Sequence, residues 1–169
     1  MISTLDASPS TLIDAASFTQ LTLPPSLLSN EPFLSLAPDC SGGLILQKSF
    51  YADFVSPGAV VGGDFDANCT AIYAIGKIQF QVLETHAERQ EALQQRMDCI
   101  EKLYQVASVS SSLHRASLML NQLCDWVGIH EASEIPAEWV ARLAGVQPKT
   151  VHLAWEKYWQ DCQLFVERS

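Results

Sequence analysis

The chain has 169 residues, a net charge of −9 and a pI near 4.7, so it is long enough for one domain or two small ones whose cores need no disulfides. This acidic balance argues against a nucleic-acid-binding protein, because contacts of Lys and Arg with phosphates supply most of the non-specific affinity for nucleic acid. From Ile135 onward, however, four basic residues balance four acidic residues, so the acidic excess lies upstream of that point.

Residues 1–40 are rich in Ser, Thr and Pro and show neither an alternating nor a helical hydrophobic period, so we expect an N-terminal arm or lead-in. From Gly42 to Leu83, short apolar runs alternate with glycine-containing breaks, which is typical of strands and turns. The predicted strands contain Leu44–Leu46, Phe50–Tyr51, Ala59–Val61, Ala71–Ile75 and Ile78–Val82. This pattern predicts a small antiparallel sandwich or β roll.

From Glu84 the apolar spacing becomes helical, and we expect a long helix that ends at Ala107. Its apolar positions at intervals of four, three and four form a seam over two heptads, made of Leu93, Met97, Ile100 and Tyr104. This seam either pairs two subunits of a homodimer or packs into the core of its own domain. Two heptads alone make a weak coiled coil, so a dimer here needs support from the sheet. A second seam predicts another helix from Leu113 to Val127, which Gly128 ends.

The segment Ile135–Gln160, after a predicted loop at His130–Glu134, has the pattern of a helix-turn-helix. Pro136 suits the first turn of one helix, Pro148 opens the other, and Gly145 can adopt the left-handed conformation of the turn. The interior of the unit is expected to hold Val140, Ala141, Ala144, Val146 and Val151.

A helix-turn-helix inserts the N-terminal end of its second helix into the major groove, where here it would present Gln147, Lys149, Thr150 and His152. We expect Lys149 to reach a guanine or a phosphate, and Gln147 to pair with adenine. His152 can contact a base edge or the backbone, and Thr150 the backbone.

Two alternatives to DNA binding stay open for this segment. It can be a helical hairpin that only resembles the motif, or a helix-turn-helix that docks onto a protein, such as another regulator or RNA polymerase.

The chain has no nucleophile elbow, phosphate loop or dinucleotide fingerprint, and Asp64 and Asp66 are expected to be turn residues. We therefore expect a regulator and not an enzyme.

The cysteines are five in number, scattered, and without a C-x-x-C pair, which is typical of a reducing compartment. The sequence has no basic leader before an apolar run and no stretch of eighteen consecutive apolar residues. We therefore expect a cytoplasmic protein that does not contact a membrane. The four histidines have no partners at metal-ligand spacing, so we expect no metal and no other cofactor.

The segment Phe54–Trp159 resembles the cyclic-AMP receptor protein and FNR family of transcription regulators. Phe54–Glu84 resembles the last strands of that family's cyclic-nucleotide-binding roll, Glu84–Ala107 its dimerisation helix, and Ser112–Gly128 the helix that opens its DNA-binding domain. The resemblance implies a homodimer that binds a palindromic double-stranded DNA site near a promoter.

The sequence departs from the family pattern at three places. The family's Gly-Glu pair and phosphate-binding Arg are replaced by Gly63-Asp64 and Asn68-Cys69-Thr70, with no Arg between Ser49 and Gly76. A phosphodiester needs a cation or a cradle of backbone N–H groups, so we expect no cyclic-nucleotide effector. In the second helix of the motif, Pro148–Leu153 lacks the family's two arginines, and only Leu164–Val166 is left for a wing.

The predicted fold class is therefore α+β, with a small antiparallel β roll, a long dimerisation helix and a C-terminal helix-turn-helix domain that has little or no wing. The expected divisions are a lead-in at 1–40, a truncated roll with the dimerisation helix at 41–112, and the DNA-binding domain at 113–169.

Overall fold

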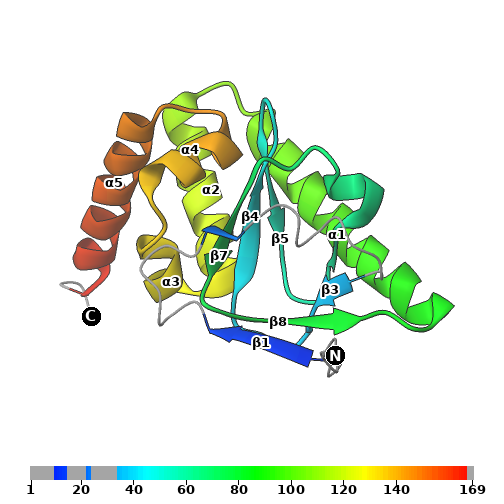
Figure 1. Ribbon diagram of the computed structural model, residues 1–169. Coiled ribbons are helices and arrows are strands. Elements are labelled where there is room, and N and C mark those ends of the chain that lie inside the picture. The colour runs from blue at the N-terminus through cyan, green and yellow to red at the C-terminus, as the bar shows by residue number, and fades with distance from the viewer. Residues whose placement is uncertain (1–9, 15–21, 24–33, 167–169) are drawn as a thin grey trace.

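The computed structural model describes residues 10–14, 22–23 and 34–166. The protein is α+β, and its strands precede its helices along the chain (Figure 1). The strands are β1 (Ser10–Asp14), β2 (Thr22–Leu23), β3 (Leu34–Leu36), β4 (Gly43–Gln47), β5 (Ala52–Val55), β6 (Val60–Val61), β7 (Ala71–Ile75) and β8 (Lys77–Val82). A 3-10 turn, η3 (Gly63–Asp66), precedes β7. The helices are α1 (His86–Ala107), α2 (Ser112–Val127), α3 (Ile129–Ser133), α4 (Ala137–Ala144) and α5 (Pro148–Val166).

The strands form two antiparallel sheets, one in the order β1-β8-β3-β6 and the other in the order β2-β7-β4-β5. Apolar side chains from both sheets share one buried core, which includes Leu36, Leu44, Leu46, Val55, Val61, Ile72, Ile78 and Phe80. The glycine breaks serve as turns, because Gly58, Gly62 and Gly76 all have positive φ values that side chains with a Cβ rarely adopt. The antiparallel β structure predicted for the N-terminal part of the chain is therefore confirmed.

Three predicted segments differ from the structure. The lead-in 1–40 was expected to contain no strands, yet β1, β2 and β3 come from it and pair with β8, β7 and β6. Phe50 lies in a tight turn and not in a strand, because the Lys48 amide donates to the Tyr51 carbonyl at 2.8 Å and β5 begins only at Ala52. The predicted loop His130–Glu134 is mostly the short helix α3.

The long helix α1 begins with a capping box. The Glu88 amide donates to the Thr85 hydroxyl at 3.2 Å, and the Thr85 amide donates to the Glu88 carboxylate at 2.9 Å. Hydrogen bonding of the Glu88 carboxylate, first to the Thr85 backbone and then to the Thr85 side chain, lowers the pKa of Glu88. The helix ends at Ala107 as predicted, and α2 ends at Gly128 as predicted.

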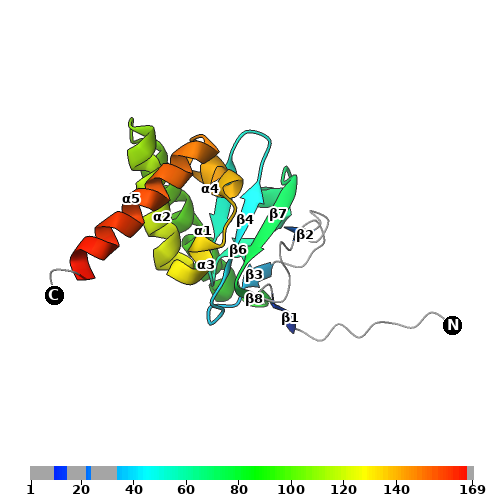
Figure 2. The same ribbon diagram turned by 90° about the vertical axis from the view of Figure 1, so that its left-hand side faces the viewer.

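A second core joins the outer face of the β2-β7-β4-β5 sheet to the helices, and Figure 2 shows the helices on one side of β4 and β7. The rings of Phe54 on β5 and Trp126 on α2 stack at 4.3 Å between centroids, and Tyr73 on β7 lies 5.4 Å from Trp139 on α4. Burial, with Glu134 nearby, raises the pKa of Tyr73. This core contains buried residues from both sides of residue 112, among them Phe54, Leu103 and Leu120.

None of the helices in the described part of the chain combines the length and the apolar character that a membrane span requires.

Candidate nucleic-acid interface

The helices α4 and α5 are joined by a three-residue turn at 145–147. Gly145 ends α4 with φ 62° and ψ 44°, which is the left-handed conformation predicted for it. The amides of Gly145 and Val146 both donate to the Ala141 carbonyl, so the last turn of α4 closes on itself. Pro148 opens α5 as predicted, whereas Pro136 is the residue before α4 and not part of its first turn.

The small and apolar side chains of this segment lie between the helices. Val140, Ala144 and Val151 have no exposed surface, Ala141 is buried, and Val146 is half-buried. Their burial agrees with the prediction, and it fixes which side of α5 faces the protein. The opposite side of the first turns of α5 therefore faces solvent.

The residues predicted to contact DNA lie on this solvent-facing side. Gln147, Lys149 and His152 are exposed, and Thr150 is half-buried with its amide donating to the Gln147 carbonyl at 2.9 Å. The N-terminal end of a helix carries a partial positive charge and unpaired N–H groups, which favour an anion. Lys149 adds a full positive charge at the same end.

Arg115 on α2 is a residue of this region that the sequence analysis missed. Its guanidinium donates to the carbonyls of Ala144 and Gly145 at 3.2 and 3.1 Å, at the end of α4. It also donates to the carbonyls of Val109 and Ser110 at 2.6 and 3.1 Å, in the connection between α1 and α2. The sequence shows only an Arg near the start of a predicted helix, and two of its four partners lie about thirty residues away.

The predicted seam of α1, which we call the α1 stripe, comprises Leu93, Met97, Ile100 and Tyr104. Met97 and Tyr104 are 52% and 73% exposed, and the other two are half-buried. The helix packs against the protein through Ala92, Arg96, Cys99 and Leu103, each one residue before a member of the stripe, and through Val106. The α1 stripe is therefore not the core face of its own chain and is left partly open to solvent.

A buried ion cluster, formed by Lys48, Asp53, Asp66 and Arg96, joins α1 to the sheets. The Asp66 carboxylate accepts from Lys48 at 2.8 Å and from Arg96 at 3.0 Å, and Arg96 also pairs with Asp53 at 3.1 Å. The side chains of Lys48 and Asp66 have no exposed surface, and that of Arg96 is 1% exposed. Two cations and two carboxylates leave the cluster neutral.

The turn residues of η3 have different surroundings. Asp64 and Asp66 both lie in this turn, as expected, but only Asp64 is exposed. Asp66 points inward, where it also accepts a hydrogen bond of 2.7 Å from the Gly62 amide. The sequence analysis missed its cationic partners, Lys48 and Arg96. The signal for Arg96 was its helical spacing from the buried residues Ala92 and Cys99 on the same face of α1.

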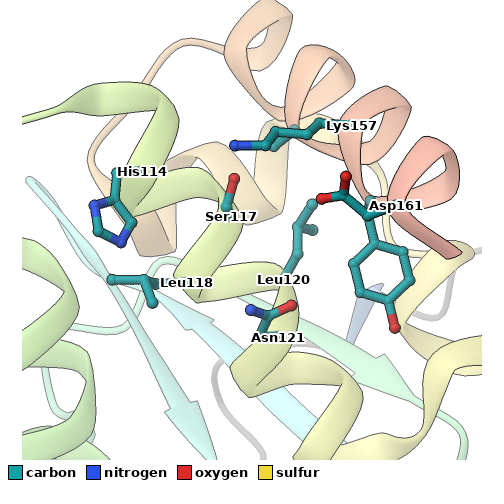
Figure 3. A pocket seen from close by; sticks show the side chains of 9 residues that line it. His114, Ser117, Leu118, Leu120, Asn121, Lys157 and Asp161 are labelled. Carbon is teal, nitrogen blue, oxygen red and sulfur yellow. The ribbon is translucent and has the colours of Figure 1, made fainter. Parts of the chain in front are cut away.

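A groove of about 260 Å³ lies between α2 and α5, next to the candidate interface (Figure 3). His114, Ser117 and Asn121 come from α2, Lys157 and Asp161 from α5, and Leu120 lines the floor between them. The groove is open to solvent and carries charges of both signs. Among the side chains that the structure describes, no three His, Cys, Asp or Glu residues are placed to hold a metal ion.

None of the cysteines in the described part of the chain forms a disulfide. Burial raises the pKa of the Cys69 thiol, which opposes formation of the nucleophilic thiolate.

No protein-family model matches this chain, and a search of curated proteins finds no matching sequence.

Proposed function

We propose that the protein is a transcription regulator that binds double-stranded DNA as a cytoplasmic homodimer, with α4 and α5 as its helix-turn-helix. The observation that carries this proposal is the exposure of Gln147, just before α5, and of Lys149 and His152 on its first turns, while Val151 is fully buried. A helix-turn-helix needs this combination, since one side of its second helix packs on the first and its N-terminal end enters the major groove.

The charge distribution supports approach to DNA by one face. The protein as a whole is acidic, and repulsion from phosphates disfavours contact through most of its surface. The segment from Ile135 onward is neutral, and its positive end is the start of α5 with Lys149.

We propose that the protein is a divergent member of the cyclic-AMP receptor protein and FNR family, in which the two sheets form a small β roll.

Replacing Lys149 with Glu tests the DNA-binding proposal. In a dimer this change reverses the charge at two places on each DNA site, so the loss of affinity should exceed the about 1–3 kcal/mol of one base contact. The measurement is a titration of a duplex site selected with the wild-type protein, at several salt concentrations. The wild-type affinity should fall steeply with salt, because bound phosphates release counterions.

Lys77→Glu is the matched control, since Lys77 is an exposed lysine on β8 and the net charge changes equally. It should change the affinity far less than Lys149→Glu. A folded Lys149→Glu protein with unchanged site preference and affinity would show that α5 does not bind DNA.

We further propose that no cyclic nucleotide acts as an effector. The cations that act on Cys69, in the stretch that replaces the family's Arg, are Lys48 and Arg96, and both are buried and already paired with Asp66 or Asp53. A cyclic phosphate would have to displace both carboxylates from a site closed to solvent, which is costly. Calorimetry with cyclic AMP and cyclic GMP at millimolar concentration should give no saturable heat, and a saturable signal would contradict this part of the proposal.

A second function, docking onto another regulator or RNA polymerase, is favoured by the apolar surface of α5. Leu153 and Trp159 are 54% and 45% exposed, and the rings of Trp155 and Trp159 stack at 5.8 Å between centroids. Aromatic and aliphatic side chains of this kind act as anchors at protein interfaces. Absence of binding to random duplex DNA at low salt would favour this function over the first.

A further inference from the structure

Arg115 connects the end of α1 with the turn that precedes α5. The four carbonyls that it binds belong to two segments, Val109-Ser110 after α1 and Ala144-Gly145 after α4. Five N–H donors in a rigid plane allow a guanidinium to bind both segments at once, whereas the three donors of a lysine radiate from one atom. The two segments are therefore held together by one side chain.

Apolar packing does not fix this turn equally well. The body of α4 is held by Val140, Leu143 and Ala144, which are buried in the core shared with the sheet. The turn itself is open, since Gly145 and Gln147 are exposed and Val146 is only half-buried. The carbonyls of Ala144 and Gly145 would otherwise lack partners from the helix that they end, so Arg115 supplies the directional contacts there.

The position of this turn sets where α5 starts relative to α1. Figure 1 shows α2 and α4 between α1 and α5. From α2, Arg115 binds the segment after α1 and the segment after α4. In a dimer paired through the α1 stripe, the distance between the two copies of α5 depends on the angle between α1 and α5 in each chain. That distance determines which spacing of DNA half-sites both helices can contact together.

We propose that Arg115 is a positioning residue that specifies the half-site spacing of the DNA site, and this inference rests on the proposed function. Arg115 acts through the carbonyls of the turn and not through phosphates, because its guanidinium is already engaged by four protein acceptors. Its loss should therefore relax the choice of spacing more than it weakens binding to a single half-site.

The test uses the full chain and a series of duplexes in which the selected half-sites are separated by the preferred spacing or by one or two base pairs more or less. For the wild type, affinity should fall about tenfold or more away from the preferred spacing. Arg115→Lys keeps the charge but loses the planar fork, and this discrimination should fall to about twofold. Arg142→Lys, the same change at an exposed arginine of α4, should keep the wild-type discrimination.

A role in stability alone would lower the melting temperature and the affinity for all spacings together, and would leave their ratio unchanged. An unchanged ratio in folded Arg115→Lys protein overturns the inference while the proposed function stands. If Arg115→Lys does not fold, one glycine inserted after Ser108 separates α1 from the Arg115 contacts instead and should relax the spacing in the same way. Retained discrimination in that insertion variant also overturns the inference, whereas a wild-type protein that binds no duplex overturns the proposed function itself.

Discussion

At the scale of single residues, the strongest constraint on this protein is the buried ion cluster of Lys48, Asp53, Asp66 and Arg96. Removing charges from water costs several kcal/mol per ion, and this cost is recovered only when each charge is paired and hydrogen-bonded. Asp66 meets that condition with three donors: Lys48, Arg96 and the Gly62 amide. It therefore holds η3, the end of β4 and helix α1 in one arrangement.

Asp66→Ala should lower the free energy of unfolding by about 3–5 kcal/mol, because it leaves two buried cations without their common partner. Urea denaturation followed by circular dichroism measures this change. Asp64→Ala, in the same turn but exposed, should stay within about 0.5 kcal/mol of the wild type. Equal effects of the two substitutions would show that Lys48 and Arg96 do not depend on Asp66 as a partner.

The residues that were predicted correctly are those whose role follows from local rules. Gly145 and Val151 were identifiable because a turn requires a left-handed residue and a helix pair requires an apolar contact at fixed spacing. Arg115, Lys48 and Asp53 were not, since their partners lie in other elements of the chain. A single sequence does not show which distant carbonyl or carboxylate a cation will meet.

At the scale of elements, α1 has two adjacent faces: one lies in the core, and the other, the α1 stripe, is only partly covered by its own chain. Its bounds were predicted to within two residues, because the helical period and the capping box are local signals. The core face lies one residue before the α1 stripe. The sequence pattern did not indicate it, because Ala92 is small and Arg96 is charged. The strands β1, β2 and β3 were missed because short strands with distant partners leave no periodic pattern.

The α1 stripe allows the dimer prediction to be tested at Met97, which is more exposed in the single chain than the half-buried Ile100. Met97→Glu should convert the dimer to monomers without unfolding it, because Met97 is 52% exposed in the single chain and a glutamate there is buried only on pairing. Light scattering gives the mass, and circular dichroism checks the fold. Gln105→Glu, which places the same charge on another exposed face of α1, should remain dimeric. A dimeric Met97→Glu protein would place the interface elsewhere.

At the scale of the whole molecule, the helices and the sheet behave as one packed body. The core that includes Ile45, Phe54 and Tyr73 on the sheet continues through α2 to Val140 and Val151 of the candidate interface. A regulator that moves its DNA-binding unit on a hinge needs an interface that separates readily. Here that separation would expose a continuous apolar core, so the core keeps α4 and α5 attached to the sheet, and the contacts of Arg115 add the directional restraint at the start of α5.

This arrangement predicts a single cooperative unfolding transition for the full chain. Tryptophan fluorescence reports on all four tryptophans, of which Trp126 and Trp139 contact the sheet through Phe54 and Tyr73, while far-ultraviolet circular dichroism reports on all helices. The two probes should give coincident urea transitions. Phe54→Ala should lower the free energy of unfolding by about 3–5 kcal/mol with both probes, because it removes a fully buried ring that stacks on Trp126. A fragment of residues 113–169 should fail to unfold cooperatively on its own, since its half of the core would face water. Two separate transitions, or a fragment with its own sharp transition, would show that the division expected at residue 112 is a real domain boundary and that α5 is free to move relative to α1.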